Sequence, residues 1–261
     1  MMRAAMRLLA GVYALAIYGF IFLPVAILVL YSFQATRFPV PPFTGPSLRW
    51  YEAVLADRRL MDGLVNSVTV AVLSSAVAVL LGFLAAYGFA RFRLPAPTLL
   101  RALITAPLMV SYLVIGMGLL ILFNSAGVPK SLVSAGIAHG VINLPLCFAI
   151  IYSQIGDHHL YAERAARDLG ARQWQILVLV TAPMLWPALF ASFFLAMTFS
   201  WDEFVMAFLL TRFDTTLPVE IWNLLRSGLN PKTNAVGSLV FGVSIVFVLV
   251  IEVVLFRAWR R

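Results

Sequence analysis

The chain has 261 residues, of which 62% are hydrophobic and only 11% are charged. An ordinary globular domain is about 45–50% apolar and about 25% charged, and so small a protein has no interior that could hide the excess, so the composition excludes a disordered chain and argues against a soluble enzyme. A single cysteine excludes a disulfide framework, and the formal charge of +8 does not require nucleic acid as a partner, because basic loops give a membrane protein the same excess.

Six apolar stretches long enough to cross a bilayer follow one another along the chain. A helix needs about 20 apolar residues to cross about 30 Å of hydrocarbon, and none of the six contains Lys or Arg. Their length and their lack of two-residue alternation predict helices rather than barrel strands. The predicted spans are Leu9–Tyr31, Ser67–Ala90, Ala102–Phe123, Leu132–Ile155, Pro183–Leu209 and Ala235–Leu255. We therefore expect an all-α polytopic membrane protein with a single transmembrane domain over residues 1–261.

Basic residues in the loops predict the orientation. If the N-terminus is cytoplasmic, the inner segments hold 11 Lys and Arg residues and the outer loops hold 8. Arg91 and Arg93 adjoin the second span, and Arg257, Arg260 and Arg261 end the chain. Because such flanking residues favour the cytoplasmic side, both termini are expected there. The first outer loop is long enough for a short amphipathic helix around Leu48–Leu55.

The loop at about 156–181 is the only sizeable polar segment on the predicted cytoplasmic side. Its small residues recur at positions i, i+3, i+4 and i+7, which predicts a helix with one narrow face. This face consists of Ala162, Ala165, Ala166 and Leu169. The other face carries two i,i+4 pairs of opposite charge, Glu163 with Arg167 and Arg164 with Asp168. Gly170 is placed to end the helix. The small face fits a groove of a partner protein, or it packs on the protein's own inner ends, since alanines are good helix formers.

The segment 163–183 resembles the EAA signature of permease subunits in binding-protein-dependent ABC importers. That signature is Glu-Ala-Ala, three residues, Gly, nine residues, then Ile-x-Leu-Pro. The residues at the expected spacing are Ala165, Ala166, Gly170, Val180 and Pro183, whereas Ala182 replaces the leucine. Arg164 occupies the glutamate position, and Glu163 precedes it by one residue, which is a rotation of about 100° on a helix. The family's role for that glutamate is therefore not transferred to Arg164.

Other segments are similar to the spermidine/putrescine-type permeases of the MetI-like superfamily. They are the six spans, Asn66-Ser67, 199–204, Leu217-Pro218, and 228–231 with Asn234-Ala235. The resemblance implies a MetI-like ABC importer permease fold in a bacterial inner membrane, with the loop helix Ala162–Gly170 docked into a cytoplasmic ATPase. It also implies a second permease subunit, two ATPase subunits that bind ATP and Mg²⁺, and a soluble solute-binding protein, with lipid around the spans and no nucleic acid.

The sequence also lacks the motifs of an enzyme. It has no Gly-x4-Gly-Lys-Ser/Thr loop, whose backbone amides would hold nucleotide phosphates, and no Gly-x-Ser-x-Gly or His-Glu-x-x-His. We therefore expect a non-catalytic subunit that binds no cofactor or metal itself, with ATP hydrolysis on a separate partner.

Two adjacent carboxylates, Asp202 and Glu203, fall within the fifth predicted span. An ionised carboxylate inside a membrane costs about 2.5–3.5 kcal/mol on insertion scales, so it usually faces a cavity or a partner. A cationic amine on the solute path could bind there, with Trp201 adding a cation–π contact and Tyr112 as a further lining candidate. Only one of the two carboxylates is expected to face the path, because consecutive helical residues point about 100° apart. Alternatively, Ser200 and Glu203 form a capping box that restarts a broken helix, or Asp202 pairs with a basic residue of a partner.

These features favour a permease subunit of an ATP-driven importer that takes up polyamines by alternating access. The same importer class for an aminophosphonate, an opine or another organic cation is an alternative. An ATPase-independent secondary transporter is a second alternative, which the few embedded carboxylates and the lack of a visible repeat weaken.

Overall fold

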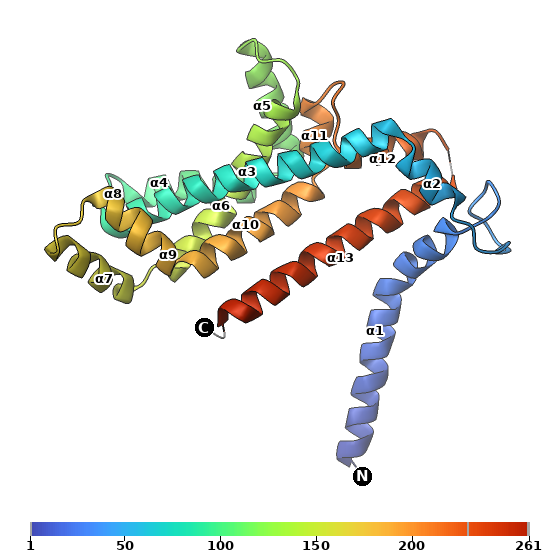
Figure 1. Cartoon of the computed structure of the whole chain (residues 1–261), viewed down its shortest axis with the longest axis horizontal. Coiled ribbons are helices and arrows are strands. Elements are labelled where there is room, and N and C mark those ends of the chain that lie inside the picture. Colours follow the sequence, from blue (N-terminus) through green and yellow to red (C-terminus); the bar gives the residue numbers. More distant parts are fainter. Residues whose placement is uncertain (1, 229, 260–261) are drawn as a thin grey trace. The chain divides into compact units, whose positions relative to one another are not determined.

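The structure, a computed structural model, describes residues 2–228 and 230–259. Its regular elements in that part of the chain are helices (Figure 1). In chain order they are α1 (Met2–Ser32), α2 (Arg49–Leu55), α3 (Arg58–Arg91), α4 (Pro97–Thr105), η1 (Ala106–Met109), α5 (Tyr112–Ser125), α6 (Leu132–Gln154), α7 (Asp157–Asp168), α8 (Gln173–Ile176), η2 (Leu177–Thr181), α9 (Ala182–Met184), α10 (Trp186–Trp201), α11 (Val205–Leu210), α12 (Leu217–Arg226) and α13 (Pro231–Trp259). The expectation of an all-α protein is confirmed, and α2 lies where the first outer loop was predicted to be helical.

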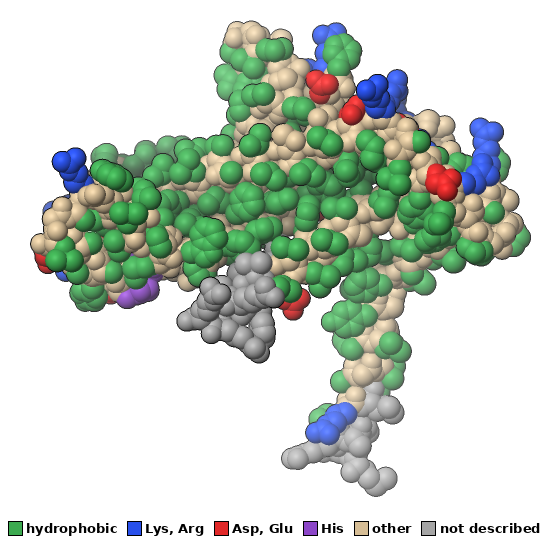
Figure 2. Space-filling view, in the orientation of Figure 1, with side chains coloured by type: hydrophobic (Ala, Val, Ile, Leu, Met, Phe, Trp, Pro, Cys, Tyr) green, Lys and Arg blue, Asp and Glu red, His purple; other side chains and the backbone are tan. Residues whose placement is uncertain are grey.

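Four of the described helices are long and apolar enough to cross a membrane, and the number rises to six if two bent pairs each count as one span. The four lie in α1, α3, α6 and α13, which contain the first, second, fourth and sixth predicted spans. Figure 2 shows hydrophobic side chains over most of the visible face. Apolar surface on this scale requires a non-aqueous surrounding. Among the basic residues behind the predicted orientation, Arg260 and Arg261 lie outside the described residues.

The third and fifth predicted spans are interrupted rather than continuous. The chain bends by 108° between Pro97–Met109 and Tyr112–Ser125, and by 75° between Gln173–Met184 and Trp186–Trp201. Pro107 lies in η1 and Pro187 in the first turn of α10. Proline has no N–H to donate and its ring clashes with the preceding turn, so a helix cannot continue through it undisturbed. The sequence located both apolar segments but did not predict their bends. The second bent pair also begins ten residues before the fifth predicted span, Pro183–Leu209, and ends eight residues before that span ends.

The chain divides into two compact units, of which the first comprises residues 1–61 and 220–245. Within this unit, the Tyr51 hydroxyl lies 2.6 Å from Ser32 Oγ and donates to Ser238 Oγ at 3.1 Å, so it joins α1, α2 and α13. Lys232 forms an ion pair with Asp57 at the beginning of α13. These contacts give the long loop after α1 a defined structure.

The second unit comprises residues 62–219 and 246–261. In it α6 packs on α10, and α11 packs on α5 and α6. The buried core includes Phe83 of α3, Cys147 and Phe148 of α6, and Leu185 beside α10. A Cβ atom on Gly82 would come within 2.9 Å of both Cys147 Cβ and the Phe148 backbone nitrogen. Glycine at position 82 therefore permits the close approach of α3 to α6.

Candidate functional site

The predicted cytoplasmic helix is α7, and its C-terminal end has the expected glycine. Gly170 has φ +87°, a backbone conformation that side chains disfavour. Its N–H donates to the Arg167 carbonyl at 2.9 Å, and the Ala171 N–H donates to the Ala166 carbonyl at 3.0 Å. These two bonds form a Schellman motif, which satisfies carbonyls that the end of a helix leaves open. Gly170 therefore turns the chain sharply away from the last helical residues.

Glu163 is buried and binds residues outside its own helix. Its carboxylate accepts two hydrogen bonds from Arg91, at 2.7 Å from Nε and 3.3 Å from Nη2. It accepts a third from the Thr181 hydroxyl at 2.9 Å. The side chain of Glu163 is 1% exposed and that of Arg91 is 13% exposed. A bidentate pair of this kind fixes orientation as well as distance, so Glu163 clamps α7 to the end of α3 and to η2.

The predicted pairing of the charges on α7 is therefore wrong. Glu163 binds Arg91 rather than Arg167, and Arg167 donates to Gln173 at 3.2 Å. Gln173 in turn donates to the Tyr87 hydroxyl of α3. The prediction used spacing on the helix alone, whereas α3 lies close enough to supply a buried partner for the carboxylate.

The outward surface of α7 also differs from the predicted alanine face. Ala165 is exposed and Leu169 is 89% exposed, but Ala162 and Ala166 are half-buried. Tyr161, Arg164, Arg167 and Asp168 are also exposed in this part of α7. Arg164, at the glutamate position of the signature, thus points away from the clamp that Glu163 forms.

Thr181, the third member of the clamp, ends the π-helical segment η2. A π-helical turn holds one residue more than an α-helical turn and is often found at functional sites. Because η2 leads through α9 into α10, the carboxylate of Glu163 connects α7 to two routes into the membrane-spanning helices: α3 and α10.

His159 lies on the buried side of α7, where its Nδ1 accepts a hydrogen bond from the Gly156 N–H at 3.2 Å. Burial lowers the pKa of His159 below its ordinary value, as do His158 and Arg91, against an opposite effect of Glu163. The folded protein thus disfavours the charged ring more than the unfolded chain does.

We expect the docking of α7 to weaken as the pH falls below about 6.5, the ordinary pKa of histidine. A lowered pKa contributes stability above the unfolded value and loses it as the pH falls through the folded value. Hydrogen exchange of the α7 amides, corrected for intrinsic rates, would measure this between about pH 7.5 and 5.5. The variant His159→Gln should flatten the dependence, and the exposed neighbour His158→Gln should retain most of it. Equal slopes for the two variants would contradict the assignment.

The carboxylates in the fifth span have different surroundings. Glu203 is buried and accepts hydrogen bonds from the N–H groups of Val205, Met206 and Ala207, at 3.0, 2.8 and 3.3 Å. It therefore caps α11 where the broken span restarts. Asp202 ends α10 and is exposed. Of the two carboxylates, Asp202 is therefore the exposed one and Glu203 the buried one.

Ser200 does not join this cap. Its Oγ lies 2.6 Å from His139 Nδ1 and 3.1 Å from Ser74 Oγ. His139 Nε2 lies 3.5 Å from the carboxylate of Glu203. The capping alternative is thus correct for Glu203, but the expected capping box with Ser200 is not formed, because Ser200 binds other helices instead.

Trp201 and Tyr112 have different exposures. Trp201 is 2% exposed and its ring meets Phe247 edge-on at 5.6 Å, so it packs in the interior instead of offering its face to a cation. Tyr112 begins α5 directly after the 108° bend and is 39% exposed.

Sequence reasoning did not identify Arg91 and Thr181 as partners of Glu163. Arg91 had been assigned to orientation only, and 72 residues separate it from Glu163. Charge complementarity between two segments near the same predicted membrane face was the available signal for that pair.

The comparison with known families identifies the chain. The family described as "Binding-protein-dependent transport system inner membrane component" matches residues 78–260. The chain belongs to this family. This permease is therefore an inner-membrane component of a transport system, and its EAA-like segment lies within the matched residues.

Characterised relatives cover most of the permease. It is 28% identical over 249 residues to the spermidine/putrescine transport system permease protein PotC of Escherichia coli (strain K12), covering 95% of this chain and 94% of PotC. It is 32% identical over 233 residues to the putrescine transport system permease protein PotI of the same strain, covering 86% and 83%.

A solved structure has the same fold. The permease is similar, with a TM-score of 0.70 and 15% identity, to a chain in the crystal structure of a bacterial alginate ABC transporter in complex with alginate pentasaccharide-bound periplasmic protein. The match covers 95% of this chain and 93% of that chain. The MetI-like permease fold expected from the sequence is therefore confirmed.

Proposed function

We propose that this permease is one of two transmembrane subunits of an ATP-driven importer of polyamines. The main support for a role in coupling is the set of hydrogen bonds that Glu163 accepts from Arg91 and Thr181. These bonds attach α7, one face of which is exposed, to two segments that continue into membrane-spanning helices. The names of PotC and PotI support the substrate class. Both units then form a single transmembrane permease domain with cytoplasmic termini.

The partners follow from what the chain lacks and exposes. Since the sequence has no phosphate-binding loop, two separate ATPase subunits carry ATP and Mg²⁺ and bind the open surface of α7. A second permease subunit completes the solute path, because six spans enclose too little space alone. A soluble solute-binding protein delivers the solute, as the periplasmic protein in the alginate complex suggests.

In this mechanism α7 moves as a rigid body together with the helices to which it is attached. ATP-driven closure of the two ATPases displaces α7, and the clamp passes the displacement to α3 and through η2 to α10. A rigid-body rotation of these helices then opens the path to one side of the membrane and closes it to the other. Solute and nucleotide shift this equilibrium only through different affinities for its two states. No covalent chemistry is required of this chain.

Asp202 is the carboxylate that we assign to the path. It is exposed, and among the residues that the structure describes its carboxylate has no ion pair. The Glu203 carboxylate is occupied by three backbone N–H groups and caps the first turn of α11. Tyr112 stays a candidate for the lining of the path. The buried Trp201 packs against Phe247 and is not assigned to the path.

Replacing Asp202 by Asn is expected to lower putrescine uptake about tenfold, because an exposed ion pair with an amine is lost in a partly dehydrated path. Uptake of labelled putrescine into proteoliposomes that contain the whole importer would measure this. Asp214→Asn, which removes an exposed carboxylate from a loop, is the matched control and should change uptake less than twofold. Undiminished uptake by the Asp202 variant would remove the proposed contact.

The same assay separates the alternatives. Uptake that requires ATP and the partner subunits supports the importer, whereas uptake by this chain alone, driven by an ion gradient, would support a secondary transporter. If an aminophosphonate, an opine or another organic cation is taken up and putrescine is not, the importer class stands and the substrate assignment fails.

A further inference from the structure

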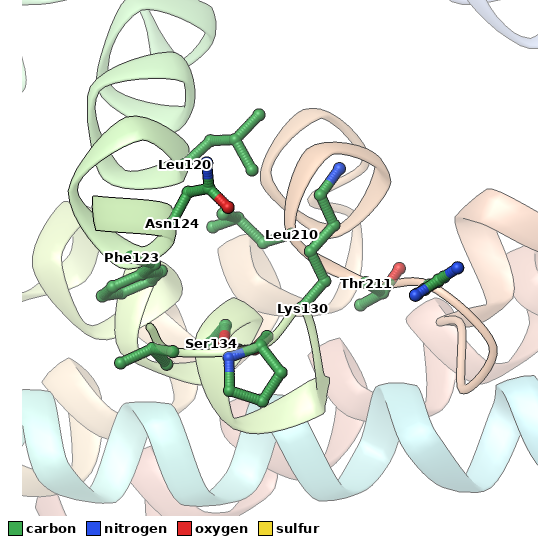
Figure 3. A pocket seen from close by; sticks show the side chains of 10 residues that line it. Leu120, Phe123, Asn124, Lys130, Ser134, Leu210 and Thr211 are labelled. Atoms are coloured by element: carbon green, nitrogen blue, oxygen red, sulfur yellow. Dashed lines mark hydrogen bonds between the residues drawn. The ribbon is translucent and has the colours of Figure 1, made fainter. Parts of the chain in front are cut away.

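A cavity of about 590 Å³ lies at the end of the second unit that is remote from α7 (Figure 3). It opens between the last turn of α5, the first turn of α6 and the end of α11. Because α6 begins at this cavity and ends beside α7, its 23 residues separate the two by about 35 Å. If α7 is cytoplasmic, the cavity faces the outside.

The cavity is lined by both apolar and polar side chains. Leu120, Phe123 and Leu210 are among the apolar ones, and the polar ones are Asn124, Lys130, Ser134, Thr211 and Arg212, of which Lys130 and Arg212 are cations. Figure 3 shows Lys130 extended along the opening, with Asn124 on the neighbouring helix. A volume of this size is in the range of sites that bind small molecules or inserted side chains.

Both cations at the rim are exposed, and the ion pairs found among the described residues involve neither of them. The guanidinium of Arg212 lies 4.9 Å above the ring of Phe213, which is itself 84% exposed. Arginine guanidinium groups commonly stack on aromatic faces in this way. Arginine and aromatic residues are also the types enriched in protein interfaces.

The two positive charges at the rim of the cavity favour an acidic ligand over a basic one. Two uncompensated cations repel a polyamine, so the cavity is not the binding site of that substrate. They attract carboxylates, and the predicted outer loops as a whole carry eight basic and five acidic residues. Both cations lie in loops beyond the apolar helices, where a soluble protein has access.

We propose that this cavity receives acidic side chains of the soluble solute-binding protein when that protein docks on the permease. The inference rests on the proposed function, because it names the contact through which that protein delivers its solute. The carboxylates bind Lys130 and Arg212, and an adjoining apolar side chain packs against Phe123.

The test uses the complete importer in membranes of phosphatidylcholine and measures ATPase stimulation by its solute-binding protein loaded with putrescine. Lys130→Glu together with Arg212→Glu should raise the receptor concentration for half-maximal stimulation at least about tenfold, because like charges then face each other. Basal ATPase activity and the rate at saturating receptor should not change. Lys130→Gln with Arg212→Gln should give a smaller shift of about threefold. Added salt should reduce the difference from wild type.

The matched control is Arg37→Glu together with Arg58→Glu, which reverses two exposed charges of the first outer loop that do not line the cavity and should shift the concentration less than twofold. Equal shifts for the two pairs overturn the proposal. A defect seen only when anionic phosphatidylglycerol is present, with receptor affinity unchanged, identifies a lipid headgroup as the occupant and also overturns it. Failure of the receptor to stimulate the wild-type importer would instead overturn the proposed function.

Discussion

ATP-driven uptake is expected to fall at least tenfold when Glu163 is replaced by alanine. The substitution leaves the Arg91 guanidinium, which is 13% exposed, without its partner. Removing one member of a buried ion pair costs about 3–5 kcal/mol, and the remaining exposure of Arg91 favours the lower end of that range. The lost free energy weakens the attachment of α7 to α3 and η2, so α7 no longer moves together with these segments. Putrescine uptake by the reconstituted importer and hydrogen exchange of α7 measure the two effects.

Two further variants separate a loosely attached α7 from a misfolded protein. Glu52→Ala removes an exposed glutamate of α2 and should leave uptake unchanged. Arg91→Leu combined with Glu163→Leu removes both charges, so it should recover much of the lost stability while uptake stays low. If the Glu163→Ala permease keeps more than half of wild-type uptake, the clamp does not transmit the movement.

Replacing Leu169 by Asp is expected to detach the ATPase subunits from the complex. Leu169 is 89% exposed at the end of α7, where Gly170 turns the chain away. An apolar anchor of that kind typically contributes 2 kcal/mol or more to an interface, so its loss weakens binding about 30-fold. Co-purification of the ATPase with the permease and titration of the ATPase against the reconstituted complex measure the change.

Gly170→Asp tests the same contact through the backbone. A residue with a side chain at φ +87° is strained by about 1–2 kcal/mol, which distorts the turn that presents Leu169. The control is Leu48→Asp, which places the same charge on a leucine that is 61% exposed in the loop before α2. ATPase binding that is equally strong in the Leu169 variant and in this control would place the docking surface elsewhere.

Local patterns in the chain were sufficient for much of this architecture. Hydropathy located all six apolar segments, and alanine periodicity with a following glycine located α7 and its last turn. Both signals depend on residues within one or two turns of each other, which is also the range over which a helix forms. Hydropathy did not reveal the bends near Pro107 and Pro187, because the mean hydropathy of a segment is the same whether its helix is continuous or broken.

The functional groups depended on contacts between residues far apart in the chain. Spacing placed Glu163 on an exposed face, yet α3 brings Arg91 to it and makes it the most buried charge of α7. Likewise Glu203 and Asp202 are adjacent and chemically alike, but the restart of a helix at Val205 occupies one carboxylate and leaves the other open. No pattern within a few residues encodes such partners, since the free energy of burying a charge depends on which distant groups the packed helices bring to it.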